Sequence, residues 1–136
     1  MTLTSQILAL DVGTRRIGVA QADSVSRIAF PLTTVDVDGD EISKIGKLVA
    51  DNQPIALVVG YPRNQSGEPT AQTALVQEFS EKLKSFGTPI VFQDESLTSV
   101  IAEERLSAQG NYTKADIDAM AATIILSDYL ESTNGH

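Results

Sequence analysis

The chain contains no cysteine and no tryptophan, and its one histidine, His136, is the last residue. Disulfides, thiolate metal sites and cysteine nucleophiles are therefore excluded, and no Ser–His–Asp triad can be built without another histidine. No run of about 18 apolar residues occurs, so we expect no membrane span. The first six residues lack a basic segment and a long apolar segment, so we expect no secretory signal. These absences favour a cytoplasmic protein.

Basic side chains are also scarce. Lysine and arginine together number 10 against 18 acidic residues, which gives a formal charge of -8. Phosphate-binding proteins usually carry a basic surplus, so the charge at face value argues against a nucleic-acid partner. A GxxxxGK[ST] loop is absent as well, which excludes a P-loop nucleotide site.

The order of secondary structure is the first positive signal. With 136 residues and 42% hydrophobic content, the chain is typical of a single domain spanning 1–136. Expected strands are 7–12, 17–20, 28–37, 55–59 and 89–92, and expected helices are 41–52, 70–86, 98–108 and 114–130. The first three strands have no helix between them, whereas the later ones require helical crossovers and parallel pairing. The order βββαβαβαα thus predicts an α/β fold, a five-stranded mixed sheet flanked by helices, with 131–136 as a frayed tail.

Several single residues predict local features. Pro31 inside the third expected strand indicates an edge position or a bulge. Asp40 is expected to cap the helix that begins at Glu41. Gly87 and Gly110 are expected to end the second and third helices.

Two carboxylates lie where apolar residues are expected. Asp11 shares a strand face with Ile7 and Ala9, and an unpaired buried carboxylate there is costly. Asp118 belongs to the apolar stripe of the last helix, which must face the sheet. The alternative for Asp11 is a bond to the amides of the following turn. The alternative for Asp118 is a first-turn aspartate that the helix N-terminus stabilises, a role that suits Asp116 better.

A third candidate lies at the end of the fifth strand, where Asp94 and Glu95 are adjacent. Ligands gather at the carboxyl ends of strands in such sheets. Because successive side chains point to opposite faces, only one of the two shares a face with Asp11, and spacing does not choose between them. The other is expected to cap the helix that begins near Thr98.

Carboxylates that converge in a dry cleft repel each other unless a proton or a cation joins them. The available ligands are hard oxygens, which favour Mg²⁺ or Mn²⁺. Two such ions about 3.5–4 Å apart can activate water and stabilise the leaving oxygen in phosphodiester hydrolysis. Two divalent ions would also reduce the net charge to about -4, so the charge does not exclude a local, metal-mediated contact with nucleic acid.

Four segments together resemble the motifs of the YqgF family, which is also called RuvX-like or Holliday junction resolvase-like. They are 8–20 (LALDVGTRRIGVA), 58–64 (VVGYPRN) with Gly67, 94–99 (DESLTS), and 117–122 (IDAMAA) with 124–126 (IIL). The motifs occur in the family's order and cover nearly the whole chain.

This resemblance implies a ribonuclease H-like fold and a nuclease of the small-subunit ribosomal RNA precursor, most simply one that processes the 5′ end of pre-16S rRNA. It also implies a metal-dependent site at Asp11, Glu95 and Asp118, and it is the resemblance that selects Glu95 over Asp94. Two residues depart from the pattern: Ser96 and Ser99 stand where the family's third motif usually has arginine and threonine. If the family's arginine contacts phosphate or orients the glutamate, this chain lacks that contact.

Arg15, Arg16 and Arg63 are the nearest basic residues to the site strands and are the expected phosphate contacts. For Arg15 and Arg16, a solvated hairpin turn is an equal alternative. Asn64 and Thr98, from the second and third motifs, complete the expected substrate-binding set.

Three other functions remain open. A Holliday junction resolvase acting on branched DNA would work as a dimer, because a junction is two-fold symmetric. A nucleotide-binding module of the actin type would use residues 11–14 as a phosphate loop, but such proteins close two domains around ATP and 136 residues supply one. A catalytically weak nucleic-acid-binding scaffold would explain Ser96.

For the nuclease, the expected partners are RNA and ribosomal particles, and the expected state is a monomer or weak homodimer.

Overall fold

A computed structural model describes residues 5–62, 70–95 and 98–132, without the side chains of 95, 98–101 and 103. The strands are β1 (Gln6–Val12), β2 (Arg16–Asp23), β3 (Ala29–Asp36), β4 (Ala56–Pro62) and β5 (Ile90–Glu95). The helices are α1 (Glu41–Asn52), α2 (Ala71–Leu83) with a following 3₁₀ turn (Lys84–Phe86), α3 (Thr98–Ser107) and α4 (Lys114–Ser132). The expected element order is confirmed.

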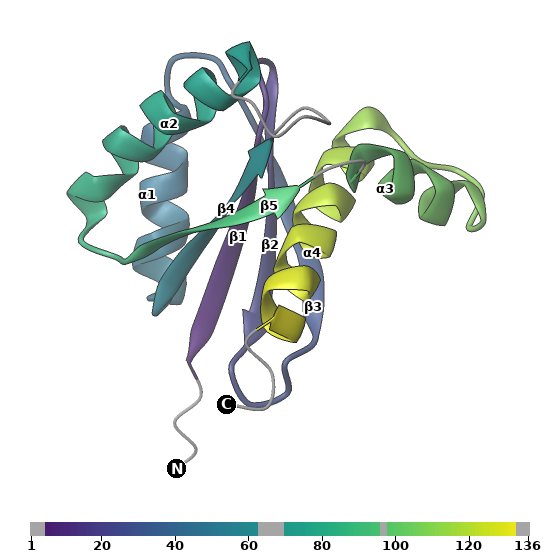
Figure 1. Ribbon diagram of the computed structural model, residues 1–136, viewed down its shortest axis with the longest axis horizontal. Coiled ribbons are helices and arrows are strands. Elements are labelled where there is room, and N and C mark those ends of the chain that lie inside the picture. The colour runs from purple at the N-terminus through teal and green to yellow at the C-terminus, as the bar shows by residue number, and fades with distance from the viewer. Residues whose placement is uncertain (1–4, 63–69, 96–97, 133–136) are drawn as a thin grey trace.

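The strands form one sheet in the order β3-β2-β1-β4-β5 (Figure 1). β1 pairs antiparallel with β2, and β2 pairs antiparallel with β3. β4 pairs parallel with both β1 and β5. The predicted five-stranded mixed sheet is therefore confirmed, with β1 at its centre.

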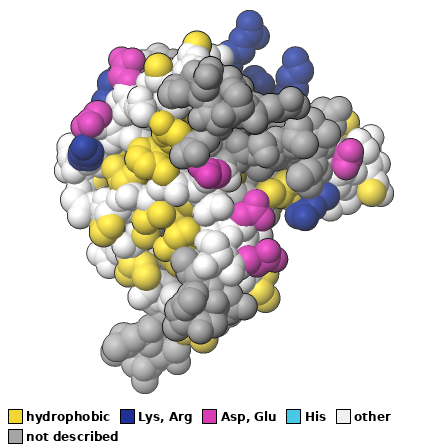
Figure 2. Space-filling view, in the orientation of Figure 1, with side chains coloured by type: hydrophobic (Ala, Val, Ile, Leu, Met, Phe, Trp, Pro, Cys, Tyr) yellow, Lys and Arg dark blue, Asp and Glu magenta, His cyan; other side chains and the backbone are white. Residues whose placement is uncertain are grey.

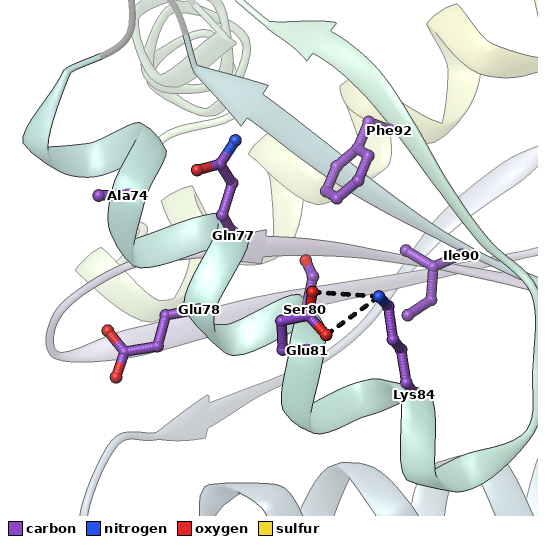
Figure 3. A pocket seen from close by; sticks show the side chains of 8 residues that line it. All are labelled: Ala74, Gln77, Glu78, Ser80, Glu81, Lys84, Ile90 and Phe92. Carbon is purple, nitrogen blue, oxygen red and sulfur yellow. Dashed lines mark hydrogen bonds and ion pairs between the residues drawn. The ribbon is translucent and has the colours of Figure 1, made fainter.

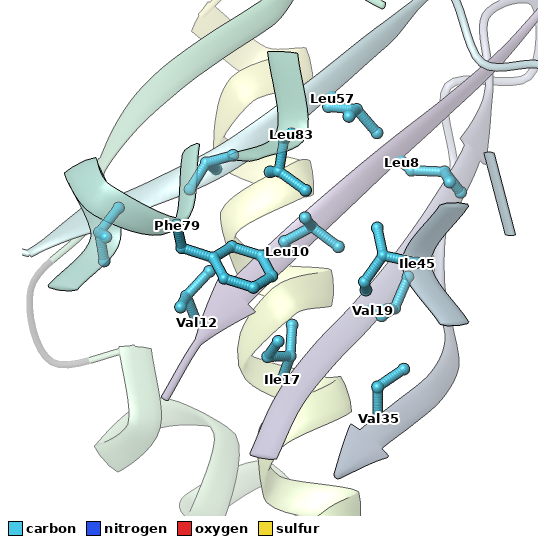
Figure 4. Packing of buried hydrophobic residues seen from close by; sticks show 12 residues of the cluster. Leu8, Leu10, Val12, Ile17, Val19, Val35, Ile45, Leu57, Phe79 and Leu83 are labelled. Carbon is cyan, nitrogen blue, oxygen red and sulfur yellow. The ribbon is translucent and has the colours of Figure 1, made fainter. Parts of the chain in front are cut away.

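Helices cover both faces of the sheet: α1 and α2 lie on one, α4 on the other (Figure 1). The strand side chains that face α1 and α2 pack against Ile45, Phe79 and Leu83, as Figure 4 shows. On the opposite face, Ile7 and Ala9 of β1 pack against α4. β1 is apolar on both alternations because it is buried on both sides.

Most of the local predictions hold. β3 is an edge strand, and its pairing with β2 shifts register beside Pro31, so that residue has both an edge position and a bulge. Gly87 and Gly110 adopt positive φ of 77° and 107° after the second and third helices.

The prediction that the Asp40 side chain caps α1 is wrong, since that side chain makes no capping hydrogen bond. With φ -116° and ψ 12°, its backbone departs from the extended conformation that aims a cap side chain at the helix.

α4 runs through Glu131 and Ser132, which the sequence assigned to the tail, and residues 133–136 lie outside the described part of the chain. Among the described helices, none is long and apolar enough to cross a membrane.

Candidate active site

Asp11 sits near the end of the central strand, on the face that α4 covers. Its neighbours Leu10 and Val12 pack toward α1 and α2, whereas Ala9 packs toward α4. Strand alternation therefore turns Asp11 toward α4, and its side chain is half-buried there. Its partner across the β1–β2 ladder is Gly18.

At Gly18 the backbone of α4 comes very close to strand β2. A Cβ atom added at Gly18 would lie 1.9 Å from the carbonyl oxygen of Asp118 and 2.9 Å from the amide nitrogen of Ala119. Only glycine permits so close an approach of the helix backbone to the strand. The residue paired with Asp11 is thus in direct contact with the backbone of Asp118, so the two predicted site aspartates share one face and one end of the sheet.

The first turn of α4 is anchored independently of Asp118. Thr34 in β3 donates a hydrogen bond from Oγ1 to the carbonyl of Ala115 at 2.7 Å. Thr113 and Asp116 form a reciprocal cap: the Thr113 amide donates to Asp116 Oδ2 at 2.8 Å, and the Asp116 amide donates to Thr113 Oγ1 at 3.2 Å. This is the structural first-turn role expected of Asp116.

Asp118 pairs with Arg16. The Arg16 Nε donates to Asp118 Oδ2 at 2.6 Å, and the two side chains are 29% and 25% exposed. Arg16 is the first residue of β2 and is half-buried, so neither the solvated turn nor a freely available phosphate contact describes it. Arg15, by contrast, is exposed at the turn.

Asp94 and Glu95, the two acidic residues at the end of β5, occupy positions on opposite faces of the sheet. The rings of Phe92 and Tyr61 lie 5.3 Å apart in a T-shaped contact, and Tyr61 packs against the core on the α1–α2 face. Asp94, two residues after Phe92, is exposed on that same face and so faces away from Asp11. The backbone position of Glu95 alternates to the face of Asp11 and pairs with Pro62, but its side chain lies outside the described residues. Its role stays a prediction.

The remaining predicted contacts are only partly covered. Arg63, Asn64 and Ser96 lie outside the described residues, and Thr98 begins α3 with an undescribed side chain. In the part of the chain that the structure describes, no three His, Asp or Glu side chains form a group able to hold a metal ion. Asp11 and Asp118 are therefore two described members of a predicted set of three.

The ends of β1 and β4 are tied to the start of α2. Gln72 donates from Nε2 to the carbonyl of Val12 at 2.6 Å, and the buried Thr73 donates from Oγ1 to the carbonyl of Pro62 at 2.6 Å. These bonds hold the carboxyl ends of two adjacent strands together at the edge where Asp11 lies.

Sequence reasoning did not identify Gln72, Thr73, Gly18 or Thr34 as residues that build the site. For Gly18, a glycine inside an apolar strand was the available signal for a close backbone approach.

A separate cavity of 540 Å³ lies between α2 and β5, and Figure 3 shows its lining side chains. Figure 2 shows hydrophobic side chains gathered in the same region. Ser80 contributes a buried hydroxyl with no hydrogen-bond partner in the described structure. Phe92, on the α1–α2 face, also lines this cavity, so the cavity is separate from the Asp11–Asp118 site.

A mixed five-stranded sheet with an acid on its central strand and another on the helix that covers it belongs to the ribonuclease H-like fold. The chain superposes on Thermus thermophilus RuvC in complex with a Holliday junction substrate with a TM-score of 0.58, at 13% identity over 96% of both chains. The fowlpox virus resolvase in complex with Holliday junction DNA also gives 0.58, at 13% identity over 95% of this chain and 99% of that one. The predicted fold is confirmed.

Sequence comparison then names the family. Residues 5–132 match the family described as "RuvX: Holliday junction resolvase", so the chain belongs to the RuvX family, a family of nucleases. A relative from Dechloromonas aromatica is 43% identical over 93% of this chain and 90% of its own length. One from Chloroflexus aurantiacus is 46% identical over 93% and 86%. Both carry the name "Putative pre-16S rRNA nuclease". The family resemblance seen in the motifs is confirmed.

Proposed function

We propose that this protein is a metal-dependent nuclease that processes the 5′ end of pre-16S rRNA. The observation that carries the proposal is the contact of Gly18 with the backbone of Asp118, which brings a helix carboxylate to the strand pair that holds Asp11. The names of relatives at 43% and 46% identity support the RNA substrate. We place the reaction in the cytoplasm, on ribosomal particles, with the protein a monomer or weak homodimer.

Asp11, Glu95 and Asp118 are the proposed ligands of two Mg²⁺ or Mn²⁺ ions. The donor set fits these hard cations, because it consists of carboxylate oxygens and the chain has no cysteine. Asp118 already accepts a bond from a cationic guanidinium, so this part of the site stabilises positive charge. When bound, the metal would supply an activated water and a counter-charge for the leaving oxygen.

The protein's own cations have separate proposed roles. Arg15 is exposed beside the site and is the described residue best placed to contact substrate phosphate. Arg63, Asn64 and Thr98 are proposed contacts on the strength of the family motifs alone. Arg16 is engaged by Asp118, so its contact with phosphate requires that this ion pair open.

Cleavage of pre-16S rRNA in Mg²⁺ or Mn²⁺ tests the proposal, with Asp11→Asn compared with wild type. Asn keeps the size of the side chain but loses its charge, and we expect a loss of about 10²–10³-fold, the scale of one electrostatic contact to the transition state. Asp51→Asn, an exposed change at the end of α1, is the matched control and should cleave normally. Cleavage that needs no metal, or that survives Asp11→Asn undiminished, would refute the proposal.

A second candidate is a Holliday junction resolvase, favoured by the fold likeness to two resolvases and by the family description. The net charge of -8 weakens it, since long duplex arms demand a basic surface. The same assay with a four-way DNA junction separates the two: symmetric junction cleavage by a dimer supports the resolvase. Binding of either nucleic acid without any cleavage would indicate a scaffold, and saturable ATP binding would indicate the nucleotide-binding module.

A further inference from the structure

The Arg16–Asp118 ion pair differs from two other ion pairs of the structure, Lys44–Asp38 and Lys84–Glu81. Lys44–Asp38 measures 2.9 Å and Lys84–Glu81 3.0 Å, and all four of those side chains are at least 43% exposed. Arg16–Asp118 is shorter, at 2.6 Å, and both side chains are at most 29% exposed. It also joins residues 102 positions apart in sequence. An ion pair with these properties is screened much less by solvent than the other two.

The backbones on both sides of this pair are held in place. The backbone of Arg16 lies opposite Asp36 in the β2–β3 ladder. The Arg16 carbonyl accepts a hydrogen bond from the Gly13 amide at 3.0 Å. Asp118 is held by the contact of its backbone with Gly18. The short aspartate side chain therefore has little freedom to leave, whereas the long arginine side chain can rotate. Opening of the pair has to come from movement of Arg16.

A guanidinium at this position competes with a divalent cation at Asp118. It occupies one carboxylate oxygen, and its positive charge repels a metal ion placed next to it. Conversely, removing the guanidinium takes away the counter-charge of the half-buried Asp118 and leaves its Oδ2 available to a cation.

We propose that Arg16 is a built-in counter-ion that holds Asp118 in place and lowers metal affinity until a phosphodiester draws the guanidinium away. This inference rests on the proposed metal-dependent function and adds coupling to it: phosphate and metal bind with positive cooperativity, because the phosphate removes the competitor of the metal. Linkage requires the reciprocal effect, so the metal must also tighten phosphate binding. Arg16 is thus a positioning residue whose place at the site changes with occupancy.

Mn²⁺ titration by calorimetry tests the proposal without measuring cleavage. Arg16→Gln should bind Mn²⁺ about 5–150-fold more tightly than wild type, the usual range of coupling between sites. Lys47→Gln, which removes the same charge from an exposed position of α1, should bind within about threefold of wild type, because exposed charges are screened. Arg16→Lys keeps the charge without the Nε–H bond, should fall between, and replaces Arg16→Gln if that variant does not fold.

A second arm adds dimethyl phosphate, a phosphodiester without a nucleoside, at saturating concentration. It should tighten Mn²⁺ binding by wild type and leave Arg16→Gln unchanged. Equal or weaker Mn²⁺ binding by the Arg16 variants, or an equal effect of the Lys47 change, would overturn the counter-ion role. An equal effect of the diester on both proteins would overturn the coupling. Absence of Mn²⁺ binding by wild type itself would instead refute the proposed metal-dependent function.

Discussion

Replacing Gly18 by alanine is the sharpest test of the site's construction. The added methyl group would lie 1.9 Å from the Asp118 carbonyl oxygen and 2.3 Å from its carbonyl carbon. Both atoms belong to the backbone of α4, which no rotamer change can move aside. Ordinary contact begins at 3.4 Å, so the strand and the helix must separate by 1.5 Å at this point.

The expected cost follows from that separation. Overpacking a core costs typically about 1–3 kcal/mol, and a clash between backbones belongs at the upper end. Loss of conformational freedom in the unfolded chain offsets about 0.5–1 kcal/mol of it. We expect Gly18→Ala to lower the free energy of unfolding by about 2 kcal/mol, which corresponds to a fall in Tm of roughly 6–10 °C for a domain of this size. A shift of about 1 Å in a reacting group also costs about 10²-fold in rate, so cleavage should fall at least that far.

Urea unfolding and pre-16S rRNA cleavage measure these two effects, and Gly46→Ala is the matched control. At Gly46 in α1, the methyl group would meet only the ring of Phe86, at 3.0 Å, and alanine favours the helix by about 1 kcal/mol. Gly46→Ala should therefore stay within about 1 kcal/mol of wild type and cleave normally. Wild-type stability and cleavage in Gly18→Ala would refute the close approach and, with it, the placement of Asp118.

Three further changes probe other contacts. Ser80→Ala should raise the free energy of unfolding by about 0.5–1 kcal/mol in urea, because it removes a buried hydroxyl without a described partner; a loss of stability would contradict this. Thr113→Ala should lower it by about 1 kcal/mol, as the cap of α4 is lost, and the exposed Ser85→Ala should not. The hydrogen bond from Lys44 holds the pKa of Asp38 below 3.8, so that pair stabilises the fold above pH 3.8 and the contribution is lost as pH falls further. Asp38→Asn should flatten the acid limb of the stability–pH curve, and an unchanged limb would show that the pair contributes nothing.

Local periodicity explains what sequence reasoning found. Pro31 inside the third expected strand indicated an edge strand with irregular pairing. Asp11 and Asp118 stood out because each interrupts an apolar pattern within its own element. The prediction of an Asp40 cap failed because the capping pattern depends only on residue type and spacing. It does not specify the backbone angles of the cap residue.

By itself, then, the sequence determined the element order, the mixed sheet, the family and two carboxylates in apolar places. All of these are carried by residues close together in the chain. Only the tertiary structure decided that Gly18 admits the backbone of α4, that Arg16 binds Asp118, and that Asp94 faces away from Asp11. These facts depend on which strands become neighbours and in what register. A contact between residues 102 positions apart leaves no period in the sequence, because it arises only when separate elements pack together.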